Sequence, residues 1–440
     1  MSTAPPKRPV PAPGSLSGLV QAGVAPALPS VGRRARRRRR LTRTLLVAGL
    51  GLVVVLLLLA TSGGGPRPPS VTVRPTLATS VTVPQPPAPA GGPATQPLAA
   101  TLPWPRTGQA AVAIPELGYL AESGPEKAVP VASLTKMMTA YVVLHDHPLS
   151  PGHVGPRITI TTAEADNFGY DTVTDQASVQ LAAGEVLTES QLLEGLLVHS
   201  ANDFAFVLAT WDAGSVNAFV AKMNADAAAL GLHHSHFADA SGFSNGSVST
   251  AVDLLRLASI DMADPTFAAI VRMPSVDLPV AGVVQSYTPL VGTIPGVVGV
   301  KSGFTTAAGG GDVLAYQTSV GGHPFVVLAA VISQEGPTVL FTAGEAALAL
   351  AGAAASHVVA DTVSAPRTTV GRVTAAGHVV DAVTASSATV LGMAGDTVRQ
   401  SVVLRPPALG APAGTTIGTA SFGIGTQSVS VPVETTAPLR

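Results

Sequence analysis

The chain has 440 residues, of which 46% are hydrophobic, so it can build a substantial core and two or three domains. Residues 1–62 carry ten of the 25 basic side chains and no acidic ones, which leaves 15 basic against 26 acidic side chains in the remainder. An acidic remainder argues against nucleic acid as a partner, and the lack of cysteine excludes disulfides, a thiolate nucleophile and a Cys-ligated metal.

The first 62 residues combine an arginine cluster with an apolar run. Residues 1–43 are rich in Pro, Ala, Gly and Ser and end in eight arginines, so they predict a disordered basic tail. The apolar run Leu45–Ala60, extended to residues 44–62, is long enough for a transmembrane anchor. The positive-inside rule keeps the tail in the cytoplasm and places the remainder outside a single-pass cytoplasmic membrane helix. A cleaved signal peptide is the alternative, since the run ends in small residues.

Three regions follow the anchor. Residues 63–108 are dominated by Pro, Thr, Ala and Gly and predict an extended linker rather than a fold. Residues 109–360 have globular patterning, and residues 366–440, with brief Val/Thr/Ile runs between Gly and Pro, predict a small all-β domain. Helices are expected at 186–210, 215–230, 250–260 and 338–358. Strands are expected at 297–302, 312–320, 324–332, 368–373, 401–404 and 428–433.

The clearest chemical signal is Ser133 followed by Lys136. Apolar residues around them follow helical spacing, so the two side chains lie three apart on one helix and can touch. A serine hydroxyl becomes a nucleophile when a base takes its proton, and a desolvated lysine near other cations has a pKa low enough to do so. An N-capping serine followed by a surface lysine is the structural alternative for this pattern. The chain has only five lysines, however, and two of them fall inside motifs.

Two further motifs follow in chain order. Ser200-Ala201-Asn202 comes after a helical stretch and offers a hydroxyl and an amide that can relay a proton and grip a peptide backbone. Lys301-Ser302-Gly303-Phe304 comes at the end of a strand-like run, where a cation and a hydroxyl suit a carboxylate-ended peptide and glycine allows close approach. The spacings are 67 residues from Ser133 to Ser200 and 101 from Ser200 to Lys301.

Together these motifs resemble the Ser-x-x-Lys, Ser-x-Asn and Lys-Thr-Gly set of penicillin-binding proteins and β-lactamases. Further stretches between residues 109 and 335 are similar to the low-molecular-mass D-alanyl-D-alanine carboxypeptidases of serine peptidase family S11. These stretches are Ala132-Ser133-Leu134-Thr135-Lys136, Gly195-Leu196-Leu197, Met223-Asn224, Leu230-Gly231, Ser241-Gly242, and Ser249-Thr250-Ala251 with Asp253.

The resemblance implies a fold and a reaction. The fold would be the α/β (α+β) transpeptidase fold of penicillin-binding proteins and β-lactamases, with a helical subdomain and a small C-terminal all-β domain. The enzyme would remove the terminal D-alanine from peptidoglycan stem peptides ending in D-Ala-D-Ala, without cofactor or metal, and β-lactams would inhibit it covalently. A transpeptidase or endopeptidase with the same site, or a non-catalytic penicillin-binding sensor, is the alternative.

The family's roles carry over to matching positions. They make Ser133 the acylated nucleophile and Lys136 its base, with Ser200 and Asn202 lining the site. Lys301 with Ser302 would hold the substrate's terminal carboxylate, beside Gly303, and the backbone N–H groups of Ser133 and Phe304 would form the oxyanion hole.

Some residues depart from the family's pattern, and two other motifs do not indicate a metal or phosphate site. Ser302 stands where the family usually has threonine, and it keeps the hydroxyl. Ala201 stands where glycine is frequent, and it is also small. The last residues, Glu434–Arg440, show no amphipathic membrane helix, so the amino-terminal anchor is expected to substitute for it. The histidines at 233, 234 and 236 lack a metal-binding pattern, and the glycines at 309–311 lack the lysine of a phosphate loop.

Overall fold

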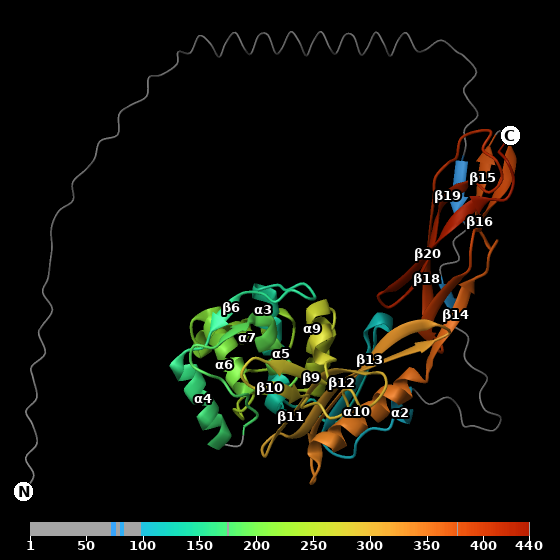
Figure 1. Ribbon diagram of the computed structural model, residues 1–440. Coiled ribbons are helices and arrows are strands. Elements are labelled where there is room, and N and C mark those ends of the chain that lie inside the picture. The colour runs from blue at the N-terminus through green and yellow to red at the C-terminus, as the bar shows by residue number, and fades with distance from the viewer. Residues whose placement is uncertain (1–71, 76–79, 83–97, 174–175, 376, 440) are drawn as a thin grey trace, which may run out of the picture. The chain divides into compact units, whose positions relative to one another are not determined.

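The structure is a computed structural model, and the residues it describes are 72–75, 80–82, 98–173, 176–375 and 377–439 (Figure 1). The predicted tail and the anchor at 44–62 lie outside these residues. Among the residues described, no single helix has both the length and the apolar character of a membrane span. The bent helix pair α6 (Asn202–Ala213) and α7 (Val216–Ala229) meets the criterion by length and composition only.

A five-stranded antiparallel sheet organises the larger region. Its strand order is β11-β12-β13-β3-β4. The strands are β3 (Gln109–Ile114), β4 (Tyr119–Ser123), β11 (Val297–Thr305), β12 (Gly309–Val320) and β13 (His323–Gln334). All three strands predicted between 297 and 332 are present. Gly321 and Gly322 both have positive φ, which allows the tight turn between β12 and β13.

The sheet separates two hydrophobic cores because successive side chains on a strand point to opposite faces. On β13, Leu328 and Ala330 belong to the core that includes Leu254 of α8, whereas Val327 and Ala329 belong to the core that includes α10. The helices of this region are α2 (Leu98–Thr101), α3 (Thr135–Asp146), α4 (Thr162–Val173), α5 (Glu189–Leu197), α6 (Asn202–Ala213), α7 (Val216–Ala229), α8 (Ala251–Asp261), α9 (Pro265–Val271) and α10 (Val339–Ala355). The predicted α/β fold with a helical subdomain is confirmed.

Short elements connect these helices. They are the 3-10 turns η1 (Pro115–Leu117) and η2 (Ala132–Leu134) and the paired strands β5 (Val129–Pro130) with β8 (Val248–Ser249), β6 (Arg157–Thr159) with β7 (Val186–Thr188), and β9 (Ser275–Leu278) with β10 (Gly282–Gln285).

The single helix predicted at 186–210 is wrong, because the segment holds strand β7 and then the separate helices α5 and α6. Thr188 begins α5 through a capping box with Gln191. Ser200 has a φ of 68°, and a residue in this left-handed region cannot continue a right-handed helix. The break gives α6 a new amino terminus at Asn202.

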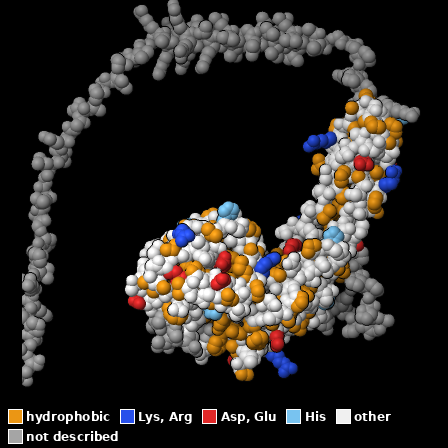
Figure 2. All heavy atoms as spheres, in the orientation of Figure 1, with side chains coloured by type: hydrophobic (Ala, Val, Ile, Leu, Met, Phe, Trp, Pro, Cys, Tyr) orange, Lys and Arg blue, Asp and Glu red, His pale blue; other side chains and the backbone are white. Residues whose placement is uncertain are grey.

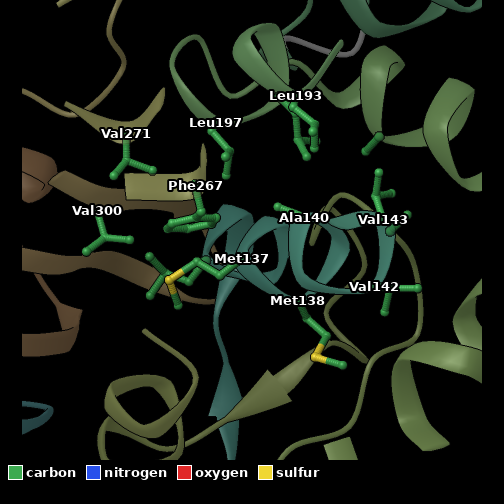
Figure 3. Packing of buried hydrophobic residues seen from close by; sticks show 14 of the residues in the cluster. Met137, Met138, Ala140, Val142, Val143, Leu193, Leu197, Phe267, Val271 and Val300 are labelled. Carbon is green, nitrogen blue, oxygen red and sulfur yellow. The ribbon is translucent and has the colours of Figure 1, made fainter. Parts of the chain in front are cut away.

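Helix α3 runs through the middle of the helical subdomain. Most of its residues are buried, and Met137, Met138 and Val143 are completely enclosed. Figure 3 shows Met137 and Met138 in the cluster that also contains Phe267 of α9 and Leu193 of α5. A helix buried on all sides is held rigidly, so residues at its start have fixed positions.

The C-terminal region is all-β, as predicted. Its main sheet also takes in two short strands from much earlier in the chain. Strands β1 (Thr72–Pro75) and β2 (Ser80–Thr82) form the two edges of its seven-stranded sheet, so part of the predicted linker is folded. Composition hid these strands because each is short and takes its hydrogen-bond partner from the distant C-terminal region. The other strands of this sheet are β15 (Thr369–Ala375), β16 (His378–Thr384), β18 (Thr397–Leu404), β19 (Thr416–Ile424) and β20 (Gln427–Thr435). Strands β14 (Val358–Ser364) and β17 (Ala388–Met393) pair with each other in a separate two-stranded sheet.

Candidate active site

Ser133 lies in the 3-10 turn η2, directly before α3. The preceding Ala132 has a φ of 48°, a conformation that is uncommon for a residue with a side chain. Gly242 approaches this turn so closely that a Cβ there would lie 1.8 Å from the Ala132 carbonyl oxygen. The strained turn and the glycine behind it fix the serine at the entrance to α3.

Lys136 connects three parts of the site. Its Nζ lies 2.9 Å from Ser133 Oγ, 2.5 Å from Asn202 Oδ1 and 2.8 Å from the Ser241 carbonyl oxygen. The predicted contact between Ser133 and Lys136 is therefore present. A neutral amine has two N–H donors, which the amide oxygen and the carbonyl satisfy, and its lone pair is then directed at the serine hydroxyl.

The charge state of Lys136 follows from its surroundings. The side chain is fully buried. Burial lowers the pKa of Lys136 well below its ordinary value, and the positive charge of Lys301 lowers it further. A lysine that loses its proton this easily can accept the proton of Ser133.

Asn202 is oriented by a segment that the sequence did not single out. Its Nδ2 donates a hydrogen bond of 2.6 Å to Gln176 Oε1, and its backbone N–H donates to the Ala177 carbonyl. The first bond directs Oδ1 toward Lys136. No motif marks Gln176, since only the folded chain brings it next to α6.

Ser200, two residues before Asn202 in the chain, is fully buried. The structure records no hydrogen bond between its hydroxyl and Ser133 or Lys136. Among the residues described, Ser200 Oγ has no hydrogen-bond partner. Its predicted part in a proton relay stays a prediction.

Strand β11 passes directly against Ser133. A Cβ on Gly303 would lie 2.7 Å from the Ser133 backbone nitrogen, so only glycine permits this approach. The edge of β11 and the Ser133 N–H group are thus adjacent, as an oxyanion hole formed by Ser133 and Phe304 requires. The side chain of Phe304 is 45% exposed.

The two polar residues of β11 are buried. Lys301 Nζ donates to the Ser302 carbonyl at 2.8 Å and lies 5.7 Å from the centre of the Tyr287 ring. Ser302 Oγ donates to the Tyr287 carbonyl at 3.0 Å. Burial lowers the pKa of Lys301 to about 7, and the charge of Asp312 opposes this shift. Sequence reasoning missed both Tyr287 and Asp312.

A groove of about 770 Å³ opens over the serine. It brings together residues of η2, α6, β11 and four loops. Its lining is Ser133, Gln176, Ala177, Asn202, Gly242, Phe243, Asn245, Tyr287, Phe304, Thr305, Thr306 and Ala307. On the face shown in Figure 2, charged side chains are scattered and form no large patch of one sign. Within the described part of the chain, no group of three or more His, Asp or Glu side chains could hold a metal ion.

A serine, a buried lysine, an asparagine and a strand edge around one groove form a candidate serine acyl-transfer site on a penicillin-binding protein fold. Residues 118–332 match the S11 peptidase family, described as D-alanyl-D-alanine carboxypeptidase. The matched region, residues 118–332, belongs to this family.

Individual relatives agree with this assignment. The chain is 37% identical over 147 residues to a D-alanyl-D-alanine carboxypeptidase of Streptomyces sp. (strain K15), covering 32% of this chain and 48% of the relative. It is 35% identical over 187 residues to D-alanyl-D-alanine carboxypeptidase DacB2 of Mycobacterium tuberculosis, covering 41% and 60%. The chain therefore spans about half of the length of these curated relatives.

A solved structure also matches. The Streptomyces K15 DD-transpeptidase superposes with a TM-score of 0.50 at 25% identity, covering 56% of this chain and 96% of that protein. This similarity supports the predicted fold class.

Proposed function

We propose that the chain is a serine-type D-Ala-D-Ala carboxypeptidase that removes the terminal D-alanine of peptidoglycan stem pentapeptides. The observation that carries the proposal is the fully buried Lys136, with Nζ 2.9 Å from Ser133 Oγ and its two N–H donors used by Asn202 and Ser241.

The reaction follows from this arrangement in two steps. Ser133 Oγ forms a bond to the carbonyl carbon of the penultimate D-alanine while its proton passes to Lys136. The C–N bond to the terminal D-alanine then breaks, and the leaving amine takes up a proton. Water adds to the acyl-enzyme, and Ser133 is released with its proton restored. The backbone N–H groups of Ser133 and Phe304 would stabilise the oxyanion in both steps.

The direct test uses the full chain and the tripeptide diacetyl-Lys-D-Ala-D-Ala. We expect the wild type to release many D-alanine molecules per enzyme molecule and Ser133→Ala to release none. Reversible peptide binding without release would instead favour a non-catalytic penicillin-binding sensor. Loss of activity in a chelator would contradict a metal-free serine mechanism.

A transpeptidase is the second candidate, because one matching structure bears that name and the site has the same chemistry. The two differ in whether water or an amine accepts the acyl group. Products formed from a pentapeptide in the presence of an acceptor amine would separate them. A cross-linked product that outweighs the tetrapeptide would favour the transpeptidase.

We further propose that residues 44–62 anchor the protein in the cytoplasmic membrane with the remainder outside. The apolar run and the arginine cluster before it support this topology. Protease added to intact spheroplasts should digest the part after Ser62 and spare an epitope placed before Arg33. The opposite pattern, or release of the mature protein from the membrane, would refute the anchor.

A further inference from the structure

A second groove, of about 680 Å³, lies next to the groove over Ser133, and the proposed reaction does not use it. Tyr287 and Phe304 line both grooves, so the two spaces meet along these residues. The rest of the second lining comes from the segment before β11, from the first turn of α10 and from the loop that precedes α10. A molecule held at Ser133 can therefore extend into the second groove.

The second groove lies on the α10 side of β11. Phe304 is directly opposite Gly310 of β12, and the side chains of opposed residues point to the same face of a sheet. An added Cβ on Gly310 would come 2.6 Å from the Val339 Cβ, so this face meets the start of α10. Gly303, whose added Cβ would approach Ser133, faces the other side. Because β11 is an edge strand, its free edge runs between the two grooves.

The lining of the second groove suits an uncharged, apolar group. Among the described residues that form it there is no charged side chain, and Pro337, Leu340 and Phe341 contribute apolar surface. Phe304 and Phe341 are 45% and 53% exposed although both are large hydrophobic residues. An apolar ligand that fills a concave surface of this kind removes these rings from water, which favours binding.

The position of the second groove along β11 indicates which end of a substrate enters it. Lys301 and Ser302 would hold the terminal carboxylate. Residues 305–307 line only the groove over the serine, whereas the second groove includes Phe304 and none of the residues after it. It also includes Tyr287, whose carbonyl accepts the hydrogen bond of Ser302 Oγ. The second groove is therefore at the end of the strand where the leaving residue would lie.

We propose that the second groove is a subsite for the side chain of the leaving residue, so that the enzyme releases larger apolar D-residues, such as D-leucine, besides D-alanine. The bond changes are those given above. Ser133 Oγ bonds to the penultimate carbonyl carbon, the C–N bond to the terminal residue breaks, and the leaving amine takes up a proton. Phe341 determines specificity and takes no part in these steps. This inference rests on the proposed function for the identity of the acyl donor.

The test compares diacetyl-Lys-D-Ala-D-Ala with the same peptide ending in D-leucine, on the full chain. We expect the wild type to release D-leucine with a kcat/KM at least equal to that for D-alanine. Phe341→Ala should lower the ratio of the D-leucine to the D-alanine kcat/KM roughly tenfold, the scale of a small lost apolar contact. Val379→Ala, an exposed valine of β16 outside both grooves, is the matched control and should change neither value.

A charge introduced into the second groove gives another measurement, which a merely structural role of Phe341 would not affect. Phe341→Asp places a carboxylate in the first turn of α10, where a helix accepts an acid. The variant should reverse the preference, so that a peptide ending in D-lysine is cleaved more efficiently than one ending in D-leucine.

Two outcomes would overturn the inference while release of D-alanine upholds the proposed function. They are rejection of the D-leucine peptide by the wild type and an unchanged ratio in both Phe341 variants. If the wild type releases no residue from either peptide, the proposed function fails, and acylation by two cephalosporins still tests the subsite. The two differ only in the size of the apolar group at position 3 of the ring that carries the leaving nitrogen. Phe341→Ala should slow acylation by the larger one selectively, and equal effects on both would contradict the subsite.

Discussion

At the scale of single residues, the site depends on one proton acceptor. On the proposed mechanism Lys136 is the base, and Asn202 and Ser241 accept hydrogen bonds from its Nζ. Since burial and the repulsion by Lys301 lower the pKa of Lys136, its neutral form exists at a lower pH than for an exposed lysine. The rate of acylation should therefore rise with pH over a range well below the ordinary pKa of lysine.

Lys136→Ala should slow acylation of Ser133 by a factor of roughly 10² or more, the usual scale for loss of a general base. Labelling by a fluorescent penicillin, followed with time, measures this rate. Lys222→Ala is the control, because Lys222 pairs with the partly exposed Asp146 and the buried Asp212, does not line the groove, and should leave labelling unchanged. Near-normal acylation of the Lys136 variant would refute its assignment as the base.

At the scale of elements, the site is the meeting of strand β11 with the turn before α3. Gly303→Ala would place a Cβ 2.7 Å from the Ser133 backbone nitrogen, so strand and nucleophile must separate. A displacement near 1 Å can cost about 10² in rate, and we expect a loss on that order in penicillin labelling.

Gly352→Ala in α10 is the matched control for Gly303→Ala. Its new Cβ meets nothing within 4 Å, and alanine favours a helix more than glycine does. It should keep full labelling and an unchanged or higher melting temperature. Wild-type labelling by Gly303→Ala would show that β11 does not need this close approach.

Helix α5 begins with Glu189, a fully buried acid whose two carboxyl oxygens have no hydrogen-bond partner among the residues described. Burial raises the pKa of Glu189 to about 7 from an ordinary 4.5. Between these pH values the folded protein holds a proton that the unfolded chain has lost, so stability falls as pH rises through this range.

Glu189→Gln removes this ionisation. It should raise the melting temperature at pH 8 and have a much smaller effect at pH 4, where both states hold the proton. Glu345→Gln, on the exposed face of α10, is the control and should leave the pH dependence unchanged. An equal effect of Glu189→Gln at both pH values would contradict the prediction.

At the scale of the whole molecule, chain order separates this protein from a class A β-lactamase. That enzyme uses a glutamate after the Ser-x-Asn motif to clear the acyl-enzyme. Here no glutamate occurs between Asn202 and Lys301, and the next in the chain is Glu335. Penicillin keeps its leaving group tethered in the site, so water gains no room to attack.

A fluorescent penicillin should therefore label the wild type stoichiometrically and persist for minutes or longer, and Ser133→Ala should take up no label. Gel fluorescence after removal of free penicillin measures both. Rapid catalytic destruction of penicillin would identify a β-lactamase instead.

The sequence by itself determined the candidate reacting groups and the strands of the central sheet after residue 297. Ser133 and Lys136 meet because helical spacing alone brings residues three apart together, and the strands at 297–332 show their pattern locally. Local patterns carry no information about partners distant in the chain. Only the tertiary structure decided that 186–210 is broken at Ser200, that residues 72–75 and 80–82 join a distant sheet, and that Asp312 lies across from Ser302. Each of these depends on which segments pack together, a choice made by the free energy of the whole fold.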